Sequence, residues 1–350
     1  MFQTLDFAWY RTTTVVKALH SLYNLTPEEL DAFFNSYKIY EHDWENKDDL
    51  KREFGDEYAA AVGKRLGDYY KVLNHLCAIG EVEKMYIPPV MNAQESITTN
   101  QTLFEETMAK DLQVSEGARV LDIGCGRGRV ANHMSSFLGA RVTGFNVDPT
   151  QIEFAKRWTT KTQNPCDFKV HDMNVRPLPF EDETFDGIYQ IQAFSLANDL
   201  ADLFREIFRI MKPGGRIAFL DWAVFDSYDP NNEEHVELMR RVKPLIGAIG
   251  CPSPTQFETY LKDAGFKVLQ SRNISEGGHQ APLIENARKL YHGVADWTKF
   301  FCKWRLMPSY FEKLLDRLNQ DGEAFVKMDT DDLVTTSYYI VAQKPPAPSE

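Results

Sequence analysis

The sequence predicts an α/β fold built on a doubly wound, mainly parallel sheet. Between Arg119 and Ile274, short apolar runs alternate with amphipathic segments, which is the order that a parallel sheet with crossover helices requires. Residues 120–128, VLDIGCGRG, form the first such unit: an apolar run, an acidic residue and three alternating glycines precede a helix-compatible stretch. With 43% apolar residues, a chain of 350 residues can bury one large core and still carry additional segments.

The expected elements follow from the period of the apolar residues and from the turn residues that bound them. Apolar runs predict strands at 120–123, 141–146, 168–171, 185–191, 216–222, 266–269 and 337–342. Amphipathic stretches predict helices between them at 130–138, 151–160, 200–211 and 254–264. The run Lys212-Pro213-Gly214-Gly215 ends one of these helices, because proline cannot continue a helix and glycine favours the turn after it.

Residues 1–115 are predicted to be mainly helical. Thr26 can cap a helix that begins at Pro27, with Glu29 completing a capping box. The charged stretch 41–56 is expected to be a loop or a solvated face.

Three further segments complete the reading of the chain. Residues 80–92 are expected to form an irregular connection, and 101–112 a helix that leads into the first strand. The aromatic-rich segment between the last two strands, about sixty residues, is too long for a hairpin loop. It predicts a helical cap or an oligomerisation surface, which is compatible with a homo-oligomer.

Charge and cysteine usage restrict the partners and the compartment. A net charge of −12 and a pI of about 5.2 argue against a nucleic-acid partner. The N-terminal segment lacks a basic stretch ahead of an apolar core, so no secretory signal is expected. The sequence contains no run of roughly 18 apolar residues, so no transmembrane segment is expected. Five scattered cysteines without a C-x-x-C pair predict reduced thiols and a cytoplasmic location, and a local patch would still allow peripheral contact with endomembranes.

The glycine loop Gly124–Gly128 indicates the ligand. A dinucleotide-binding loop has the spacing G-x-G-x-x-G and places a pyrophosphate at the helix N-terminus. Here the glycines alternate, and Asp122, two residues before the first, offers a carboxylate that suits a cation. S-adenosylmethionine (SAM) carries an ammonium and a sulfonium group and no phosphate, so SAM is the predicted cofactor. We expect the glycines to keep the turn open for this ligand; the alternative is an ordinary glycine-rich turn.

Other cofactor contacts are expected just after each strand, because parallel strands present their carboxyl ends at one edge of the sheet. Asn146 follows the second strand, where a ribose-binding residue belongs. Asp172 could accept from the adenine amine and Met173 could cover the ring, although Asp172 has a simple turn role as its alternative. The full predicted cofactor set is Asp122, Gly124, Cys125, Gly126, Gly128, Asn146, Val147, Gln151, Asp172, Met173 and Gln190.

The residues after the fourth strand, Gln190, Gln192, Phe194 and Ser195, are expected to face the transferred methyl group, and Asp221, Trp222 and Phe225 follow the fifth strand. The predicted catalytic set is Gln192, Asp221, Trp222 and Tyr228. The predicted substrate-binding set is Tyr70, Tyr86, Phe194, Ser195, Phe225 and His235. Core packing is the alternative for Trp222, and solvation is the expectation for Arg127 and Arg129. The histidines lack metal-ligand spacing, so no metal is predicted; methyl transfer needs only an acceptor held in line with the S–CH3 bond.

With these motifs the chain resembles class I SAM-dependent methyltransferases and, more narrowly, the sterol C24-methyltransferase family. The class resemblance is carried by 120–128, 176–189 (RPLPFEDETFDGIY), 212–215 (KPGG) and 261–268 (LKDAGFKV). The narrower match lies in 226–235 (DSYDPNNEEH), 144–146 (GFN) with Gln151, and 64–76 (KRLGDYYKVLNHL). The resemblance implies a Rossmann-like, seven-stranded methyltransferase sheet with N-terminal helices and a helical cap inserted before the last strand.

Two departures from the family fall on the acceptor side. The family's aromatic motif Y-E-Y-G-W-G belongs near 78–90, where only Tyr86 is aromatic, and the similar run 40–44 comes too early. The family's fourth strand runs into I-E-A-T-C-H-A, whereas Gln192 here replaces the acid and Leu196 the histidine. Because the family's carboxylate lies beside the acceptor, we expect poor turnover of its usual Δ24 sterols. Either another acceptor or a base from elsewhere, with Asp221 as first candidate, is then needed.

These observations predict a SAM-dependent methyltransferase (EC 2.1.1 class) that C-methylates a lipophilic acceptor, a sterol or a related isoprenoid. Aromatic faces, expected from Phe194, Trp222, Phe225 and Tyr228, would stabilise the carbocation that alkene attack leaves. The alternatives are an N- or O-methyltransferase of another small molecule, such as an alkaloid or phenol, and a SAM-binding protein without turnover. The predicted division is an N-terminal substrate-side region (1–115), a SAM-binding core (116–275), a cap or oligomerisation insertion (276–336), and a last strand with disordered tail (337–350).

Overall fold

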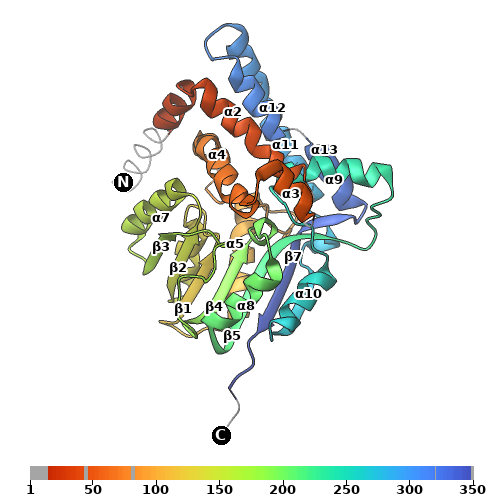
Figure 1. Cartoon of the computed structure of the whole chain (residues 1–350). Coiled ribbons are helices and arrows are strands. Elements are labelled where there is room, and N and C mark those ends of the chain that lie inside the picture. The colour runs from red at the N-terminus through yellow and green to blue at the C-terminus, as the bar shows by residue number, and fades with distance from the viewer. Residues whose placement is uncertain (1–14, 43–45, 80–82, 320, 348–350) are drawn as a thin grey trace.

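The computed structural model describes residues 15–42, 46–79, 83–319 and 321–347 and shows a seven-stranded sheet flanked by helices (Figure 1). The sheet order is β3-β2-β1-β4-β5-β7-β6. Its strands are β1 (Arg119–Ile123), β2 (Arg141–Asn146), β3 (Cys166–Val170), β4 (Phe185–Ile191), β5 (Met211–Val224), β6 (Lys267–Asn273) and β7 (Val334–Gln343). β7 pairs antiparallel with β5 and with β6, and the other pairs are parallel. The Rossmann-like doubly wound fold is therefore confirmed.

The order of the strands reverses between β1 and β4, which are neighbours in the sheet although two strands separate them in the chain. In this register Asp122 lies beside Gly144 of β2 and Tyr189 of β4. Open α/β sheets bind ligands at the carboxyl edge next to such a reversal. The motif that the sequence singles out therefore lies where the topology favours a site.

Helices cover both faces of the sheet, as crossover connections require. On one face α5 (Ile97–Leu112), α6 (Arg129–Leu138) and α7 (Pro149–Thr162) bury Phe104, Met134 and Ile152 against the strands. On the other face lie α8 (Leu200–Ile210) and α10 (Pro254–Asp263).

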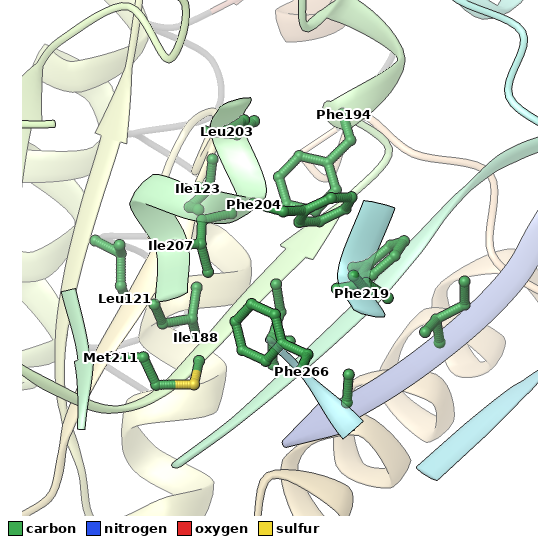
Figure 2. Close-up of a cluster of buried hydrophobic side chains, with 14 of the residues drawn as sticks. Leu121, Ile123, Ile188, Phe194, Leu203, Phe204, Ile207, Met211, Phe219 and Phe266 are labelled. Carbon is green, nitrogen blue, oxygen red and sulfur yellow. The ribbon is translucent and has the colours of Figure 1, made fainter. Parts of the chain in front are cut away.

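The face under α8 and α10 carries the larger apolar cluster (Figure 2). Leu121 and Ile123 of β1 point into it, whereas Val120 points to the opposite face, because successive strand residues alternate sides. Phe194 and Phe219 are fully buried here, with ring centroids 5.1 Å apart. This packing encloses the segment that follows β4.

A second group of helices gathers at one end of the sheet, at the top of Figure 1. These helices come from the two ends of the chain and from the segment after β5. They are α2 (Pro27–Ser36), η1 (Tyr37–Tyr40), α3 (Lys47–Phe54), α4 (Tyr58–Ile79), α9 (Glu233–Ile246), α11 (Ala281–Lys303), α12 (Tyr310–Asn319) and α13 (Gly322–Thr330).

Local signals set several boundaries of these elements. The capping box at α2 is confirmed: Thr26 Oγ1 accepts from the Glu29 N–H, and the Glu29 carboxylate accepts from the Thr26 N–H. The expectation of a loop or solvated face at 41–56 is wrong in part, because α3 forms there and buries Leu50 completely. α5 begins four residues before the expected 101, since Ser96 accepts the Thr99 N–H as its cap.

Candidate active site

The glycine loop after β1 owes its glycines to backbone conformation first. Gly124, Gly126 and Gly128 have φ values of +76°, +50° and +69°, a region that costs other residues energy. A Cβ on Gly124 would lie 2.6 Å from the Ala193 Cβ, and one on Gly128 2.6 Å from the Ala155 Cβ. A Cβ on Gly126 would meet only an ordinary contact at 3.5 Å. Gly124 and Gly128 therefore keep room for neighbouring side chains of the protein, and the role of the three glycines toward a ligand stays a prediction.

Asp122 lies buried at the end of β1, with 4% of its surface exposed. Tyr189 Oη donates to its Oδ2 at 2.9 Å. Burial raises the pKa of this carboxyl to about 7; the Tyr189 hydrogen bond opposes that rise and the negative charge of Glu105 adds to it. A cation beside it would favour the ionised form. Asp122 is therefore suited to a positively charged ligand.

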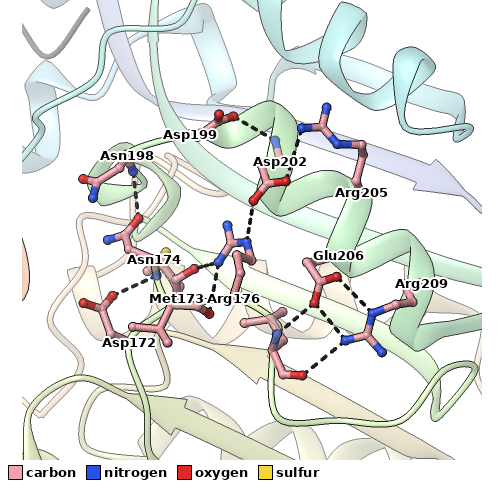
Figure 3. Close-up of polar contacts among 12 residues, drawn as sticks. Asp172, Met173, Asn174, Arg176, Asn198, Asp199, Asp202, Arg205, Glu206 and Arg209 are labelled. Carbon is pink, nitrogen blue, oxygen red and sulfur yellow. Dashed lines mark hydrogen bonds and ion pairs between the residues drawn. The ribbon is translucent and has the colours of Figure 1, made fainter. Parts of the chain in front are cut away.

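The ends of β2 and β3 complete one side of the site. Asn146 Nδ2 donates to Gln151 Oε1 at 2.7 Å, which fixes both amides at the edge of the sheet. Asp172 Oδ1 accepts the Asn174 N–H at 2.9 Å, and Asn174 Oδ1 accepts the Asn198 N–H at 2.8 Å (Figure 3).

Arg176 links the same turn to α8. It donates to the Met173 carbonyl oxygen and, through Nε, to Asp202 Oδ2 at 2.9 Å (Figure 3). α4 closes over Asp172: a Cβ on Gly63 would lie 2.7 Å from Asp172 Oδ2. Asp172 and Met173 are therefore held in place from both sides.

One pocket lies at this edge of the sheet and encloses about 940 Å³ including its open mouth. Nine of the eleven predicted cofactor residues line it: Asp122, Gly124, Cys125, Gly126, Asn146, Val147, Gln151, Asp172 and Met173. The other two do not. Gly128 lies in the turn and packs against Ala155. Gln190 is fully buried in the protein interior, where its Nε2 donates to Asp221 Oδ2 at 2.9 Å. We call this space the cofactor pocket.

Residues 83–90, here called the strap, cross the mouth of the cofactor pocket. Arg129 of α6 donates to Glu83 Oε2 from two nitrogens, at 2.8 and 2.7 Å. At the other end the Val90 N–H donates to Ser275 Oγ at 3.1 Å. Glu83, Lys84 and Met85 line the pocket, but the strap has no periodicity that would have revealed them in the sequence.

Arg127 and Arg129 also line the cofactor pocket, so the expectation that both are solvated is wrong. Arg127 is 4% exposed, with its guanidinium 4.3 Å from the ring centroid of Phe154. Arg129 stacks in the same way on Trp158, at 3.3 Å. Two aromatic side chains on α7 thus replace solvent around these cations.

A buried carboxylate anchors the middle of the strap. Glu105 of α5 accepts from Lys84 Nζ at 2.6 Å and Tyr86 Oη at 2.7 Å, and it contacts His133 Nδ1 at 2.6 Å. Burial alone would raise the Glu105 pKa, but the hydrogen bonds from His133, Lys84 and Tyr86 hold that pKa below its usual value. Glu105 therefore stays ionised and fixes the ring of Tyr86.

Gln192 ties the strap to the sheet. Its Oε1 accepts the Ile87 N–H at 3.1 Å, while its Nε2 donates to the carbonyl oxygens of Ile87 at 2.8 Å and Thr336 at 2.9 Å. Its side chain lines the cofactor pocket. The predicted catalytic amide is thus engaged with three backbone groups, which makes it a positioning residue.

A second space, here called the chamber, adjoins the cofactor pocket beneath α4. The two share Leu66, Tyr70, Lys84, Met85, Tyr86, Gln192 and Leu196. The remaining lining residues of the chamber are Tyr40, Tyr69, Leu73, Cys77, Ile87, Leu245, Ile246, Gly247 and Thr336. No Asp, Glu or His is among these lining residues, all within the described part of the chain.

The chamber lining includes four tyrosines and one charged side chain, Lys84, which is paired with Glu105. Burial raises the pKa of Tyr70 to about 12, so that phenol keeps its proton. Tyr37 packs against Tyr69 in the cluster behind the wall, with ring centroids 5.5 Å apart. Tyr40 belongs to the run 40–44, which resembles the family's aromatic motif but precedes the position expected for it near 78–90. Residues 43–45 lie outside the described part of the chain.

Two of the predicted substrate residues, Tyr70 and Tyr86, line both spaces. The other four lie outside both. Phe194 and Ser195 are buried under the β4 end, and Phe225 packs on Tyr338. His235 accepts the Asp229 N–H on α9. A strand end in sequence does not say which of its following residues turns inward, and the structure places these four away from both spaces.

Three predicted catalytic residues also lie outside both spaces. Asp221 is fully buried and accepts from the Phe194 and Trp222 N–H groups, so it holds the turn after β4. Burial raises its pKa to about 6, against the hydrogen bonds that lower it. Trp222 packs in a core cluster with α9 and α13, which agrees with core packing, the alternative to a catalytic role. Tyr228 stacks on His235. None of the three reaches an acceptor in either space.

The donor set of the cofactor pocket fits SAM. Asp122, Asp172 and Glu83 supply carboxylates for its cationic and polar groups, and Lys84, Arg127 and Arg129 supply cations for its carboxylate. Met85, Phe145 and Met173 give apolar surface for an adenine ring. Within the described residues no cluster of His, Cys, Asp and Glu is arranged to hold a metal. Fold and pocket together are those of a class I SAM-dependent methyltransferase.

Comparison with known proteins gives the family. Residues 121–219 match the family model described as a methyltransferase domain. The botryococcene C-methyltransferase of Botryococcus braunii is 30% identical over 259 residues, covering 71% of this chain and 68% of the relative. Cycloartenol-C-24-methyltransferase 1 of Oryza sativa subsp. japonica is 27% identical over 335 residues, covering 92% and 94%.

A solved structure agrees in fold. The geranyl diphosphate C-methyltransferase of Streptomyces coelicolor A3(2) superposes with a TM-score of 0.55 at 18% identity, over 71% of this chain and 82% of that one. The chain belongs to the family of SAM-dependent methyltransferases that includes the botryococcene and sterol C-methyltransferases, and it is an enzyme that uses SAM.

Proposed function

We propose that this enzyme C-methylates a neutral isoprenoid, a sterol or a linear triterpene, held in the chamber. The observation that carries the proposal is the continuity of the chamber with the cofactor pocket across Tyr70, Met85 and Tyr86. An acceptor without charge suits this wall, since an amine would need an acidic partner that the lining lacks. The one cation of the lining, Lys84, is already paired with Glu105. Relatives named for cycloartenol and botryococcene point in the same direction.

The proposed reaction needs alignment and cation stabilisation. The acceptor alkene forms a bond to the methyl carbon while the S–CH3 bond breaks, and the positive charge moves to the neighbouring acceptor carbon. Loss of a proton to water or to a base then restores an alkene. We assign the stabilisation of the cation to Tyr70 and Tyr86, whose rings each contribute roughly 1 kcal/mol or more. Gln192 holds the strap that carries Tyr86.

Within the cofactor pocket we assign Asp122 to the ammonium group of SAM, because its buried carboxyl gains most from a nearby cation. Lys84 and Arg127 are assigned to the carboxylate of SAM, and Asn146, Asp172 and Met173 to its adenosine. The methyl donor supplied there is the sulfonium group. The chain's own part is to orient it and exclude water.

The division of labour along the chain is also a proposal. Residues 116–275 supply most of the cofactor pocket, to which 83–86 also contribute. The acceptor side is formed by 1–115 together with 245–247, and 276–336 adds Thr336. Five described cysteines, none of them in a disulfide, suit a reducing cytoplasm. Within the described residues no helix has the length and apolar character needed to cross a bilayer. We propose that the enzyme meets its lipophilic acceptor at an endomembrane surface.

The test is product analysis with SAM that carries a deuterated methyl group. The panel includes a Δ24 sterol, squalene, botryococcene, a phenol and an amine, with the Asp122→Asn variant as control. The proposal expects S-adenosylhomocysteine and a deuterium-labelled hydrocarbon or sterol whose new methyl group is on carbon, with less product from Asp122→Asn at low SAM concentration. Methylation confined to the phenol or the amine would overturn it.

A further inference from the structure

The end of α11 and the turn after it expose an apolar surface that the proposed reaction does not use. Trp297 and Trp304 are 65% and 64% exposed, and Leu306 is 62% exposed. Phe300 and Phe301 are also exposed. Trp297 is 6.2 Å from Phe300 and 6.1 Å from Phe301 between ring centroids, and Phe300 is 6.1 Å from Trp304. The side chains thus form one connected patch, here called the aromatic patch.

The aromatic patch is surrounded by positive charge, in contrast to the chain as a whole. Lys299, Lys303 and Arg305 are exposed within it, and residues 297–311 contain no Asp or Glu. The whole chain has a net charge of −12. A local excess of cations in an acidic protein is complementary to an anionic surface. Tryptophan with lysine and arginine is also the composition of helices that lie at a membrane–water interface.

The opposite side of the same segment packs toward the chamber. Cys302, Met307 and Phe311 belong to the cluster that includes Tyr40 and Tyr69, two chamber-lining residues. Tyr310 Oη also donates to the carbonyl oxygen of Leu22 at 2.8 Å. α11 and α12 lie at the top of Figure 1, at the end that carries the N-terminal helices. A surface bound to the aromatic patch would therefore lie next to the acceptor side of the enzyme.

We propose that residues 297–306 dock on the anionic face of a lipid bilayer, with Trp297, Trp304 and Leu306 entering the interface and the three cations meeting lipid headgroups. A bilayer is favoured over a second protein copy because the patch joins exposed tryptophan to the exposed cations Lys303 and Arg305. The third cation, Lys299, lies 3.8 Å from Asp316 Oδ1. The patch has no acidic residues with which a copy of itself could pair. Docking brings a membrane-dissolved acceptor beside the chamber.

The test is flotation of the full chain with vesicles of phosphatidylcholine alone or mixed with phosphatidylserine. The expected result is binding that prefers the phosphatidylserine vesicles and weakens as salt is added. The double variant Trp297→Ser/Trp304→Ser should lose at least about tenfold in partitioning. Lys303→Glu/Arg305→Glu should abolish the preference for phosphatidylserine.

The matched control is Val170→Ser/Val236→Ser, which removes two exposed apolar side chains at 54% and 44% exposure elsewhere on the surface. It should float like wild type, and circular dichroism of all variants shows whether each is folded. Absence of flotation with both vesicles, or undiminished flotation of the tryptophan variant, overturns the proposal. So does a result in which the tryptophan variant changes only the mass measured by light scattering, because the patch then joins two copies of the chain.

Discussion

The side chain of Gln192 pairs with the backbone of Ile87 in both directions: Nε2 donates to the Ile87 carbonyl oxygen at 2.8 Å, and Oε1 accepts the Ile87 N–H at 3.1 Å. Nε2 also donates to the carbonyl oxygen of Thr336 in β7. One amide therefore joins the strap, the end of β4 and the last strand. Its backbone has φ +50°, a conformation retained only where the surroundings demand it.

Gln192→Glu should lower activity rather than restore an acid that relatives possess. A carboxylate at this position would face the carbonyl oxygens of Ile87 and Thr336 and would remove the donor that Nε2 gives to each. The Ile87 oxygen would keep only the longer bond from Gln280 Nε2, at 3.4 Å. The expected loss is about 1–3 kcal/mol in the free energy of unfolding, together with reduced turnover on the true acceptor. Thermal denaturation and initial rates measure the two effects.

Gln163→Glu is the matched control for this variant. It makes the same chemical change at φ +57°, on an exposed side chain. This control should remain within about 0.5 kcal/mol of wild type. If Gln192→Glu instead raised turnover, the amide would be replacing a catalytic acid and not holding the strap.

The fold was largely predictable because its signals are local. Thr26 and the glycine loop each mark a boundary through their own conformational preferences, and the apolar runs locate every strand. The run at 212–215 instead lies inside β5, because α8 already ends at Ile210. The antiparallel position of β7 between β5 and β6 has no local signal. It depends on which strand pairs with which, and pairing is decided by the whole core.

The site was predictable on the cofactor side and less so on the acceptor side. Strand ends place Asp122, Asn146 and Asp172 at one edge by topology alone. The chamber depends on how α4 and the strap settle over that edge, so Tyr40 and Tyr69 could not be assigned from spacing. The structure places Asp221 away from both spaces, which the sequence could not reveal, because a buried carboxylate that accepts backbone N–H groups looks, in sequence, like a base after a strand.

SAM affinity should depend on the charge of Asp122. Burial raises its pKa to about 7, so the ligand-free carboxyl is about half protonated at neutral pH. Because a cation binds the ionised form, affinity should fall by up to about tenfold per pH unit below that value. Calorimetry from pH 5.5 to 8, roughly spanning this range, measures it. Asp122→Asn should bind SAM at least roughly tenfold more weakly, about 1.4 kcal/mol, with a flatter pH dependence.

The same carboxyl contributes to stability with the opposite sign. Its folded pKa lies above the unfolded value of about 4, so its contribution is fully present below pH 4 and is lost as pH rises through 7. In the ligand-free enzyme, Asp122→Asn should flatten the fall in unfolding free energy across this window. An unchanged pH profile for both binding and stability would show that Asp122 does not titrate there.

Gly128→Ala should destabilise the enzyme more than its backbone angle alone requires. The added methyl group would lie 2.6 Å from the Ala155 Cβ and 2.8 Å from Phe168 Cζ. Overpacking of this kind costs about 1–3 kcal/mol, in addition to about 1 kcal/mol for the left-handed backbone. Gly117→Ala, at φ +77° with no atom within 4 Å, isolates the backbone cost. Equal losses in urea denaturation of the two variants would contradict the packing argument.

Tyr70→Leu should reduce turnover while leaving SAM binding close to wild type. The ring of Tyr70 lies on the wall between the cofactor pocket and the chamber, where the proposed cation forms. Loss of one ring face should lower kcat about five- to thirty-fold, or about 1–2 kcal/mol. Tyr70→Phe keeps the face and loses only the hydroxyl, so its kcat should remain near wild type. Rates with the identified acceptor and calorimetry with SAM separate the effects, and a Phe variant as slow as the Leu variant would assign the role to the hydroxyl.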